Sequence, residues 1–180
     1  MKIVALVGMA GSGKSEVARE FEKAGYIRVR FGDITDMEVK KAGLPLNEGN
    51  ERYFREYLRK EHGMAAYAKL NIPRMDAALK TSNVVADGLY SWEEYVLLKS
   101  YYGDKLKLAA VWASPETRYS RLAQREVRPL TREQAEARDK AEIENSNKGG
   151  PIAIADYLIV NESSLADMKK QAAQIIARLA

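Results

Sequence analysis

The chain has 180 residues, 46% of them hydrophobic and 30% charged, which suits one globular domain with a buried core. It has no cysteine and one histidine, which excludes disulfide bonds, cysteine nucleophiles, iron–sulfur clusters and cysteine- or histidine-rich metal sites. Its 29 basic and 25 acidic residues leave a net charge of +4, which suits an anionic small molecule as well as RNA.

Short apolar segments alternate with helical ones along the chain. Residues 3–7 are apolar throughout, which is typical of a strand buried on both faces of a parallel sheet. The next segment carries Val17, Ala18 and Phe21 on one helical face and ends at Gly25. Further strands are expected over 27–31, 83–86, 106–112 and 157–160, and helices over 91–102, from Pro115 and from Ser164.

The remaining segments carry more charge. Residues 35–80 and 118–141 show a helical pattern, the second of them rich in arginine and broken near Pro129, and residues 149–151 are expected to form a loop. In the last helix we expect an apolar face made of Leu165, Met168, Ala172, Ile176 and Leu179. The alternation predicts a single three-layer α/β/α domain over 1–180 with a five-stranded parallel sheet, in which 35–80 and 121–150 are mobile inserts.

One motif carries most of the functional information. The segment Gly8-Met9-Ala10-Gly11-Ser12-Gly13-Lys14-Ser15 matches the phosphate-binding pattern G-x-x-x-x-G-K-[ST] in full. Glycines permit a backbone path in which successive N–H groups point at phosphate oxygens, and a helix beginning near Gly13 adds the positive end of its dipole. Lys14 is expected to reach the β- and γ-phosphates, and the hydroxyl of Ser15 to ligate Mg²⁺. All eight residues are candidate nucleotide-binding residues.

Two carboxylates follow predicted strands. Asp33 comes after the strand over 27–31, and Asp87 follows the strand over 83–86. Ligands of open α/β sheets bind at the carboxyl ends of the strands, so both can face the same phosphates. We expect Asp87 to hold Mg²⁺ with Ser15, directly or through water, and Asp33 to act in catalysis. Each aspartate is also a common turn residue, which is the alternative interpretation.

Arginines gather on one helix. Arg118, Arg121 and Arg125 have the i, i+3, i+7 spacing of one helical face, and Arg128, Arg132 and Arg138 follow. Guanidinium groups bind the oxygens of a migrating phosphoryl group in pairs, so Arg121 and Arg125 are candidate catalytic and nucleotide-binding residues. The alternative for the others is a solvated face paired with nearby glutamates. We expect His62 to lie at a helix end rather than in a catalytic site, and Tyr53, Tyr57 and Tyr67 to pack or to line an acceptor pocket.

These motifs together resemble those of the small P-loop kinases, in the branch of dephospho-CoA kinases and adenylate-kinase-related proteins that includes an uncharacterised group of AAA-family ATPases. The resemblance covers nearly the whole chain. Phe31-Gly32-Asp33 is similar to the T-G-D of adenylate kinases or to the end of the D-A-D of dephospho-CoA kinases. Asp87-Gly88 is similar to the D-G of nucleoside monophosphate kinases, and the segment 121–125 resembles the R-L-x-x-R that opens the adenylate kinase lid.

The resemblance implies a P-loop NTPase fold of the nucleoside monophosphate kinase type, with an acceptor-binding insert at about 35–80 and a lid at about 121–150. It implies ATP and Mg²⁺ as cofactors and transfer of the γ-phosphoryl group to a nucleotide-like small molecule, either dephospho-CoA or a nucleoside monophosphate. Tyr90 and Ser91 stand where adenylate kinases carry Pro-Arg, and Asp36 and Met37 stand near an arginine of dephospho-CoA kinases. Neither acceptor signature is complete, so both acceptor classes stay open.

Two other classes of protein share one of these features: regulatory NTPases have a phosphate-binding loop, and RNA-binding modules have a surplus of basic residues. A regulatory NTPase would hydrolyse ATP without a small-molecule acceptor, but no D-x-x-G follows the loop at a suitable place and residues 147–150 lack the Asp of N-K-x-D. An RNA-binding module is disfavoured by the small basic surplus. No apolar stretch approaches the roughly 20 residues that span a bilayer, so we expect a cytoplasmic protein without a membrane partner. The sequence leaves open whether ATP or GTP is the preferred donor, and it leaves open the oligomeric state.

Overall fold

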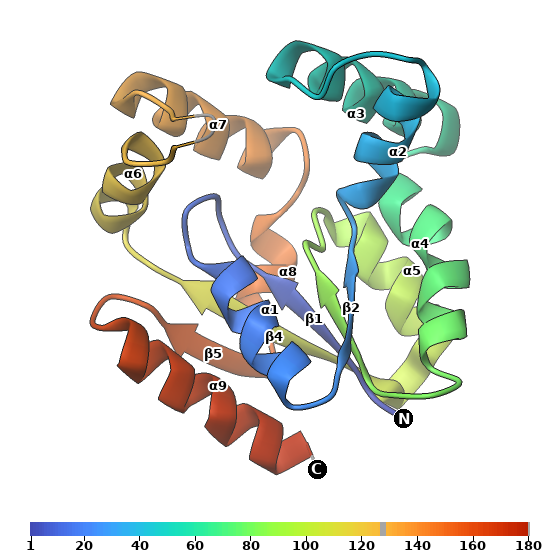
Figure 1. Ribbon diagram of the computed structural model, residues 1–180, viewed down its shortest axis with the longest axis vertical. Coiled ribbons are helices and arrows are strands. Elements are labelled where there is room, and N and C mark those ends of the chain that lie inside the picture. Colours follow the sequence, from blue (N-terminus) through green and yellow to red (C-terminus); the bar gives the residue numbers. More distant parts are fainter. Residues whose placement is uncertain (127–128, 180) are drawn as a thin grey trace.

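The computed structural model describes residues 1–126 and 129–179. Its centre is a five-stranded parallel sheet of strand order β2-β3-β1-β4-β5. Helices cover both faces of this sheet (Figure 1), which confirms the predicted three-layer α/β/α architecture. The strands are β1 (Ile3–Val7), β2 (Ile27–Arg30), β3 (Val84–Asp87), β4 (Leu106–Trp112) and β5 (Tyr157–Val160).

The helices of the described residues follow the predicted order. They are α1 (Lys14–Lys23), α2 (Asp33–Lys41), α3 (Glu48–His62), α4 (Ala66–Ala78), α5 (Trp92–Tyr102), the short 3-10 helix η1 (Gly103–Lys105), α6 (Pro115–Ala123), α7 (Arg132–Glu144), α8 (Gly149–Ala153) and α9 (Leu165–Leu179). Side chains of Asn47, Ser91, Ser114 and Thr131 cap α3, α5, α6 and α7 by accepting a backbone N–H in the first turn. None of the helices in these ranges has the length and apolar character that a membrane crossing requires.

The apolar character of the central strands divides the core into two layers. In β1, Ile3, Ala5 and Val7 pack into a cluster that includes side chains of α4 and α5. Val4 and Leu6 point the other way, into a cluster with side chains of α1 and α9. The edge strands β2 and β5 keep exposed positions, since only one neighbouring strand and one covered face bury them.

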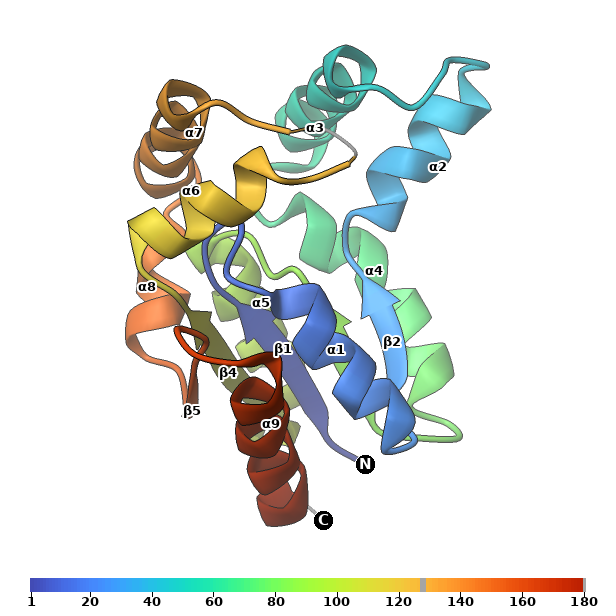
Figure 2. The same ribbon diagram turned by 60° about the vertical axis from the view of Figure 1, so that its left-hand side comes forward.

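The strand order fixes where the phosphate-binding motif lies. β1 pairs with β3 on one side and with β4 on the other, both in parallel. The chain leaving β1 therefore emerges at the middle of the carboxyl edge of the sheet, where successive connections run to opposite sides. Helices α2 and α3 rise beyond this edge on one side and α6 and α7 on the other (Figures 1 and 2). The fold thus surrounds the motif with the two segments predicted as inserts.

Some local expectations differ from the structure. Residues 149–151 begin helix α8 instead of forming a loop, because Pro151 sits in the first turn, where its missing N–H is not needed. In α9, Leu165 is 51% exposed, and Ile175 is buried where the apolar pattern favoured Ile176. Within the segment 35–80, α4 belongs to the main core, since its Tyr67 and Met75 are almost completely buried.

Candidate active site

Residues 8–13 connect β1 to α1 and follow the path that the motif predicts. Gly8 and Gly13 have φ angles of 145° and 100°, in the region that favours glycine. A Cβ at Gly13 would lie 2.3 Å from Nδ2 of Asn161, and one at Gly8 would lie 2.3 Å from the carbonyl oxygen of Val111. Both positions therefore require glycine, because of their backbone conformation and because Val111 and Asn161 lie so close. The loop leads into the N-terminus of α1, which is the arrangement that holds phosphate groups.

Lys14 begins α1 and folds its side chain back over the loop. Its Nζ donates hydrogen bonds to the carbonyl oxygens of Gly8 at 2.8 Å and Met9 at 3.0 Å. Burial of the ammonium and, next in size, the positive charge of Lys148 together lower the pKa of Lys14 to about 7, against the opposing charges of Glu142 and Asp87. A lysine in this state becomes fully charged when anionic oxygens approach it. The position suits a group that binds phosphate.

Ser15 and Asp87, the predicted metal ligands, both lie at the carboxyl edge of the sheet. Ser15 is exposed in the first turn of α1, and Asp87 ends β3 in register with Leu6 of β1. The negative charge of Asp87 acts to raise the pKa of nearby Lys14, although burial and Lys148 outweigh this effect. Oδ2 of Asp87 accepts hydrogen bonds from Nη2 and Nε of Arg28 at 2.5 and 3.1 Å.

The donor atoms at this place fit magnesium. The Ser15 hydroxyl and the second carboxylate oxygen of Asp87 are hard oxygen ligands of the kind Mg²⁺ takes. No group of three or more acidic or histidine side chains gathers into a metal site within residues 1–126 and 129–179. A magnesium ion bound here would therefore complete its shell with nucleotide oxygens and water, as Mg²⁺ usually does.

The structure shows Asp33 in a different setting. It is the first residue of α2, and its Oδ1 accepts a hydrogen bond from Nη1 of Arg30 at 3.1 Å. Its Oδ2 accepts one from Nη2 of Arg74 at 2.7 Å. Both carboxylate oxygens are thus engaged in ion pairs that fix the start of α2 onto β2 and α4. Each of these oxygens has a further lone pair, so Asp33 can accept a proton while it stays bonded to both arginines.

The first of the clustered arginines has a structural position. Arg118 is 4% exposed, and its Nη1 and Nη2 donate to the two carboxylate oxygens of Asp139 at 2.8 and 2.5 Å. Nη1 also donates to the carbonyl oxygen of Ala10, in the phosphate-binding loop, at 3.1 Å. Arg118 therefore ties α7 to the loop and is not directed at a phosphate group.

Arg121 lies beside the loop with an open donor. Its Nη2 donates to the carbonyl oxygen of Asn161 at 3.0 Å, and the side chain of Asn161 donates to the carbonyl oxygen of Ser12 at 2.8 Å. Within the described part of the chain, Nη1 of Arg121 and Oγ of Ser12 are buried without a hydrogen-bond partner. Two polar atoms without hydrogen-bond partners beside the loop favour this place as one where a ligand supplies the missing hydrogen bonds.

The other arginines of this region differ among themselves. Arg125 follows the end of α6 and is exposed. Arg128 lies outside the described residues. Arg132 pairs with Glu116 and Glu136, and Arg138 pairs with Glu142, as expected of a charged helix face.

Sequence reasoning missed an ion pair close to Lys14. Lys148 is 3% exposed, its Nζ donates to Oε2 of Glu142 at 2.8 Å, and the same ammonium lies 5.4 Å from the centre of the Tyr90 ring. Burial acts to raise the pKa of Glu142, but the charges of Lys148 and Arg138 outweigh it and hold this pKa at about 2. The sequence shows only a lysine next to Gly149 and Gly150, six residues after Glu142, and such a spacing does not reveal burial.

The residues that we expected to pack or to cap behave in three ways. Tyr53 and Tyr57 are exposed on α3 with stacked rings 6.4 Å apart. Tyr67 is 1% exposed and shares a hydrogen bond with the hydroxyl of Thr35 at 2.5 Å. His62 is the last residue of α3, at a helix end as predicted, and the backbone N–H of Gly63 caps that helix.

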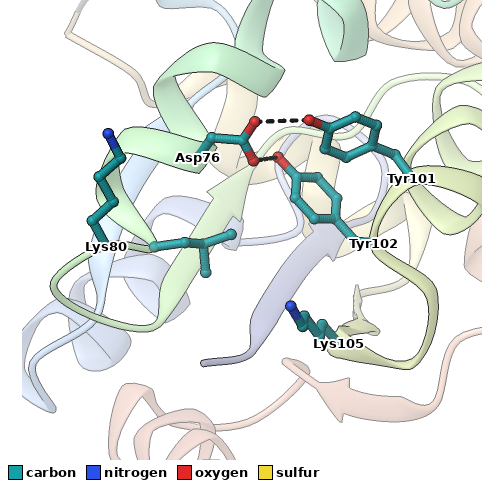
Figure 3. Close-up of a pocket in the computed structure, with 6 residues that line it drawn as sticks. Asp76, Lys80, Tyr101, Tyr102 and Lys105 are labelled. Carbon is teal, nitrogen blue, oxygen red and sulfur yellow. Dashed lines mark hydrogen bonds between the residues drawn. The ribbon is translucent and has the colours of Figure 1, made fainter.

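A pocket of ≈ 420 Å³ lies at the opposite edge of the sheet (Figure 3), lined by Asp76, Leu79, Lys80, Tyr101, Tyr102 and Lys105. Lys80 precedes β3 and Lys105 precedes β4, so the pocket faces the amino ends of the strands. Asp76 accepts hydrogen bonds from the hydroxyls of Tyr101 and Tyr102, both at 2.9 Å. With its carboxylate occupied and the loop at the other edge, this pocket is separate from the candidate active site.

Three solved structures share the fold over nearly the whole chain. A gluconokinase from Sinorhizobium meliloti superposes with a TM-score of 0.62 at 18% identity, covering 99% of this chain and 93% of that one. A shikimate kinase from Bacteroides thetaiotaomicron gives 0.64 at 13% identity, covering 99% and 98%. A dephospho-CoA kinase from Campylobacter jejuni gives 0.56 at 14% identity, covering 99% and 97%. The fold is therefore that of the P-loop kinases.

Sequence comparison places the chain in a family. Residues 4–145 match the family described as AAA domain. A UPF0200 protein of Thermococcus kodakarensis is 39% identical over 98% of this chain and 100% of its own length. A UPF0200 protein of Pyrococcus abyssi is 35% identical over 98% of this chain and 96% of its own length. The chain therefore belongs to the AAA domain family and to the UPF0200 proteins.

Proposed function

We propose that the chain is an ATP-dependent kinase that transfers the γ-phosphoryl group of Mg-ATP to a nucleotide-like small molecule, such as dephospho-CoA or a nucleoside monophosphate. The observation that carries the proposal is the loop over residues 8–15, with its required glycines and a lysine whose ammonium is bonded to the loop itself. The full-length likeness to a gluconokinase, a shikimate kinase and a dephospho-CoA kinase supports it, since each is named for phosphorylating a small molecule.

The loop and its neighbours bind the donor. Backbone N–H groups of residues 8–15 and the ammonium of Lys14 hold the β- and γ-phosphates, while Ser15 and Asp87 hold Mg²⁺. Mg²⁺, when bound, neutralises charge on the phosphate oxygens. Arg121 and Arg125 lie on the lid side and add positive charge over the same groups.

Asp33 acts on the acceptor side. If the acceptor is an alcohol, Asp33 is a candidate for taking its proton, and if the acceptor is a phosphate, Asp33 orients it or the metal shell. The helices α6 and α7 close over the loop through Arg118 and Asp139, and they exclude water that would otherwise hydrolyse ATP. Because ATP is the donor, we place the activity in the cytoplasm.

The test measures binding and transfer separately. Calorimetric titration of Mg-ATP should show tight binding by the natural protein and loss of binding in Lys14→Met. ADP release should then rise several-fold when an acceptor from a set of dephospho-CoA, AMP and CMP is added. ADP release that is slow and unchanged by every acceptor would identify a regulatory NTPase instead, and no binding of Mg-ATP or Mg-GTP would refute the proposal.

A further inference from the structure

One residue after the last strand joins the phosphate-binding loop to the helix that carries Arg121. Asn161 directly follows β5 and is 7% exposed. Its backbone N–H donates to the carbonyl oxygen of Trp112 at 2.8 Å, so Asn161 continues the pairing of β5 with β4 beyond Val160. The sheet therefore holds the main chain of Asn161, and the side chain projects from a fixed point.

The side-chain amide of Asn161 binds the main chain of the loop. Nδ2 donates to the carbonyl oxygen of Ser12 at 2.8 Å, and Ser12 is 1% exposed. The carbonyl and the following N–H of a trans peptide lie in one plane and point in opposite directions. A fixed Ser12 carbonyl therefore fixes the direction of the Gly13 N–H, one of the groups proposed to bind phosphate. The missing side chain of Gly13 makes room for this amide, since a Cβ there would lie 2.3 Å from Nδ2.

The oxygens of the same residue hold Arg121. Nη2 of Arg121 donates to the backbone carbonyl oxygen of Asn161 at 3.0 Å and lies 3.5 Å from its Oδ1. A guanidinium group is planar, so contacts at Nη2 also limit the direction of Nη1. Within residues 1–126 and 129–179, that Nη1 is buried without a hydrogen-bond partner. Asn161 thus orients an arginine whose remaining donor is available to a ligand.

The next residue fixes the beginning of the same helix. Glu162 accepts hydrogen bonds from the backbone N–H of Ser114 and from the hydroxyl of Thr117, the latter at 2.8 Å. Ser114 caps α6, and Thr117 lies in its first turn. Residues 161 and 162 therefore hold α6 both at its start and at Arg121, so the helix and the loop are tied to one short segment after β5.

From this geometry, and resting on the proposed function, we infer that Asn161 is a positioning residue that sets the Gly13 N–H and Nη1 of Arg121 towards the phosphates of one nucleotide. It acts through Ser12 and Arg121 and not on the nucleotide itself. Both groups are held before the nucleotide arrives, so less ordering is needed on binding. Loss of the amide should therefore weaken binding of Mg-ATP, and part of that loss should depend on Arg121.

Calorimetric titration of the full-length protein with Mg-ATP tests both effects. Asn161→Ala leaves the buried Ser12 carbonyl without its donor, so the Kd should rise about tenfold. Arg121→Gln should also raise the Kd. The double variant should bind at least about threefold more tightly than the product of the two single effects predicts, because Asn161 acts partly through Arg121. Should Asn161→Ala not fold, Asn161→Asp keeps the size of the side chain but turns an oxygen towards Ser12, and its Kd should rise at least as much.

Gln171 of α9 offers the matched control. Its side-chain amide also holds main chain at the end of β5, accepting the N–H of Val160 and donating to its carbonyl oxygen, both at 2.9 Å. Gln171→Ala should lower the urea midpoint and leave the Kd of Mg-ATP within about twofold of the natural value. A purely structural Asn161 would behave in the same way.

The outcomes separate this inference from the proposed function. A natural Kd in Asn161→Ala or Asn161→Asp, or single effects of Asn161→Ala and Arg121→Gln that multiply in full, would overturn the positioning role. An equal rise in Kd for Gln171→Ala would also overturn it, because the effect would then come from general loosening of β5. If the natural protein binds neither Mg-ATP nor Mg-GTP, the proposed function itself fails.

Discussion

The affinity for Mg-ATP should depend on pH through Lys14. In the free protein the pKa of this lysine is about 7, because its ammonium is buried and lies near Lys148. Phosphate oxygens favour the charged form, so binding raises this pKa towards or above the ordinary value of about 10.4. The protonated lysine is therefore the form that binds. Full affinity should be present below pH 7 and should be lost as the pH rises above 7.

The magnitude follows from the size of the shift. Above the pKa of Lys14 in the free protein, each further pH unit lowers the fraction of protonated lysine about tenfold. The lysine must be protonated before binding, so each unit weakens binding by about 1.4 kcal/mol. Between pH 7 and pH 9 the Kd should thus rise about 50-fold, which corresponds to ~2.3 kcal/mol, because half of the lysines are already uncharged at pH 7. At pH 7 binding should also take up about half a proton, since about half of the free molecules lack that charge.

Isothermal titration calorimetry measures both quantities. Titrations of Mg-ATP from pH 6 to 9 give the Kd, and repeating them at pH 7 in buffers of different ionisation enthalpy gives the proton uptake. Lys14→Gln is the control, and its weak residual affinity should not change over this range. A Kd for the natural protein that stays constant from pH 7 to 9, or a release of protons on binding, would refute the role assigned to Lys14.

Three further predictions test other parts of the structure. Gly13→Ala should abolish Mg-ATP binding in calorimetry, since φ is 100° and a Cβ there would collide with Asn161; natural affinity would contradict the loop geometry. Asp139→Asn should lower the free energy of unfolding in urea by about 3 kcal/mol, because it leaves the buried guanidinium of Arg118 without its anion, and a loss under ~1 kcal/mol would count against that ion pair. Glu94→Gln should alter the pH dependence of stability: in the folded protein burial raises the pKa of Glu94 to about 8, against 4.5 for the ordinary group, so the contribution of the natural residue is complete below pH 4.5 and is lost as pH rises to 8. Urea midpoints from pH 4 to 9 should therefore fall more steeply for the natural protein than for the variant, and parallel curves would disprove the assignment.

The sheet and the phosphate-binding loop follow from the sequence. Residues 3–7 are buried on both faces because every one of them is apolar, and that pattern leaves few alternatives to a central parallel strand. The motif after them constrains the backbone through its glycines, so both its position and its chemistry could be predicted. These features are local, and the residues that make them are adjacent in the chain.

The features that sequence reasoning missed depend on long-range contacts. Nothing in the segment around Lys148 shows that its ammonium lies buried beside Lys14, and Glu94 looks like an ordinary first-turn acid that complements the dipole of α5. Arg118 has the same helical spacing as Arg121, but Asp139 from α7 engages it, whereas Arg121 has an open donor in the described structure. Pairing across distant segments decides these roles, and a helical repeat does not encode it.

A crystal structure of the protein with Mg²⁺ and a non-hydrolysable ATP analogue tests the central claim most directly. We expect the β-phosphate to lie within hydrogen-bond distance of backbone N–H groups of residues 8–15. The ammonium of Lys14 should have turned from the carbonyl oxygens of Gly8 and Met9 towards the β- and γ-phosphates. A triphosphate bound elsewhere, for example beside Asp76, with Lys14 still bonded to its own loop, would contradict the account.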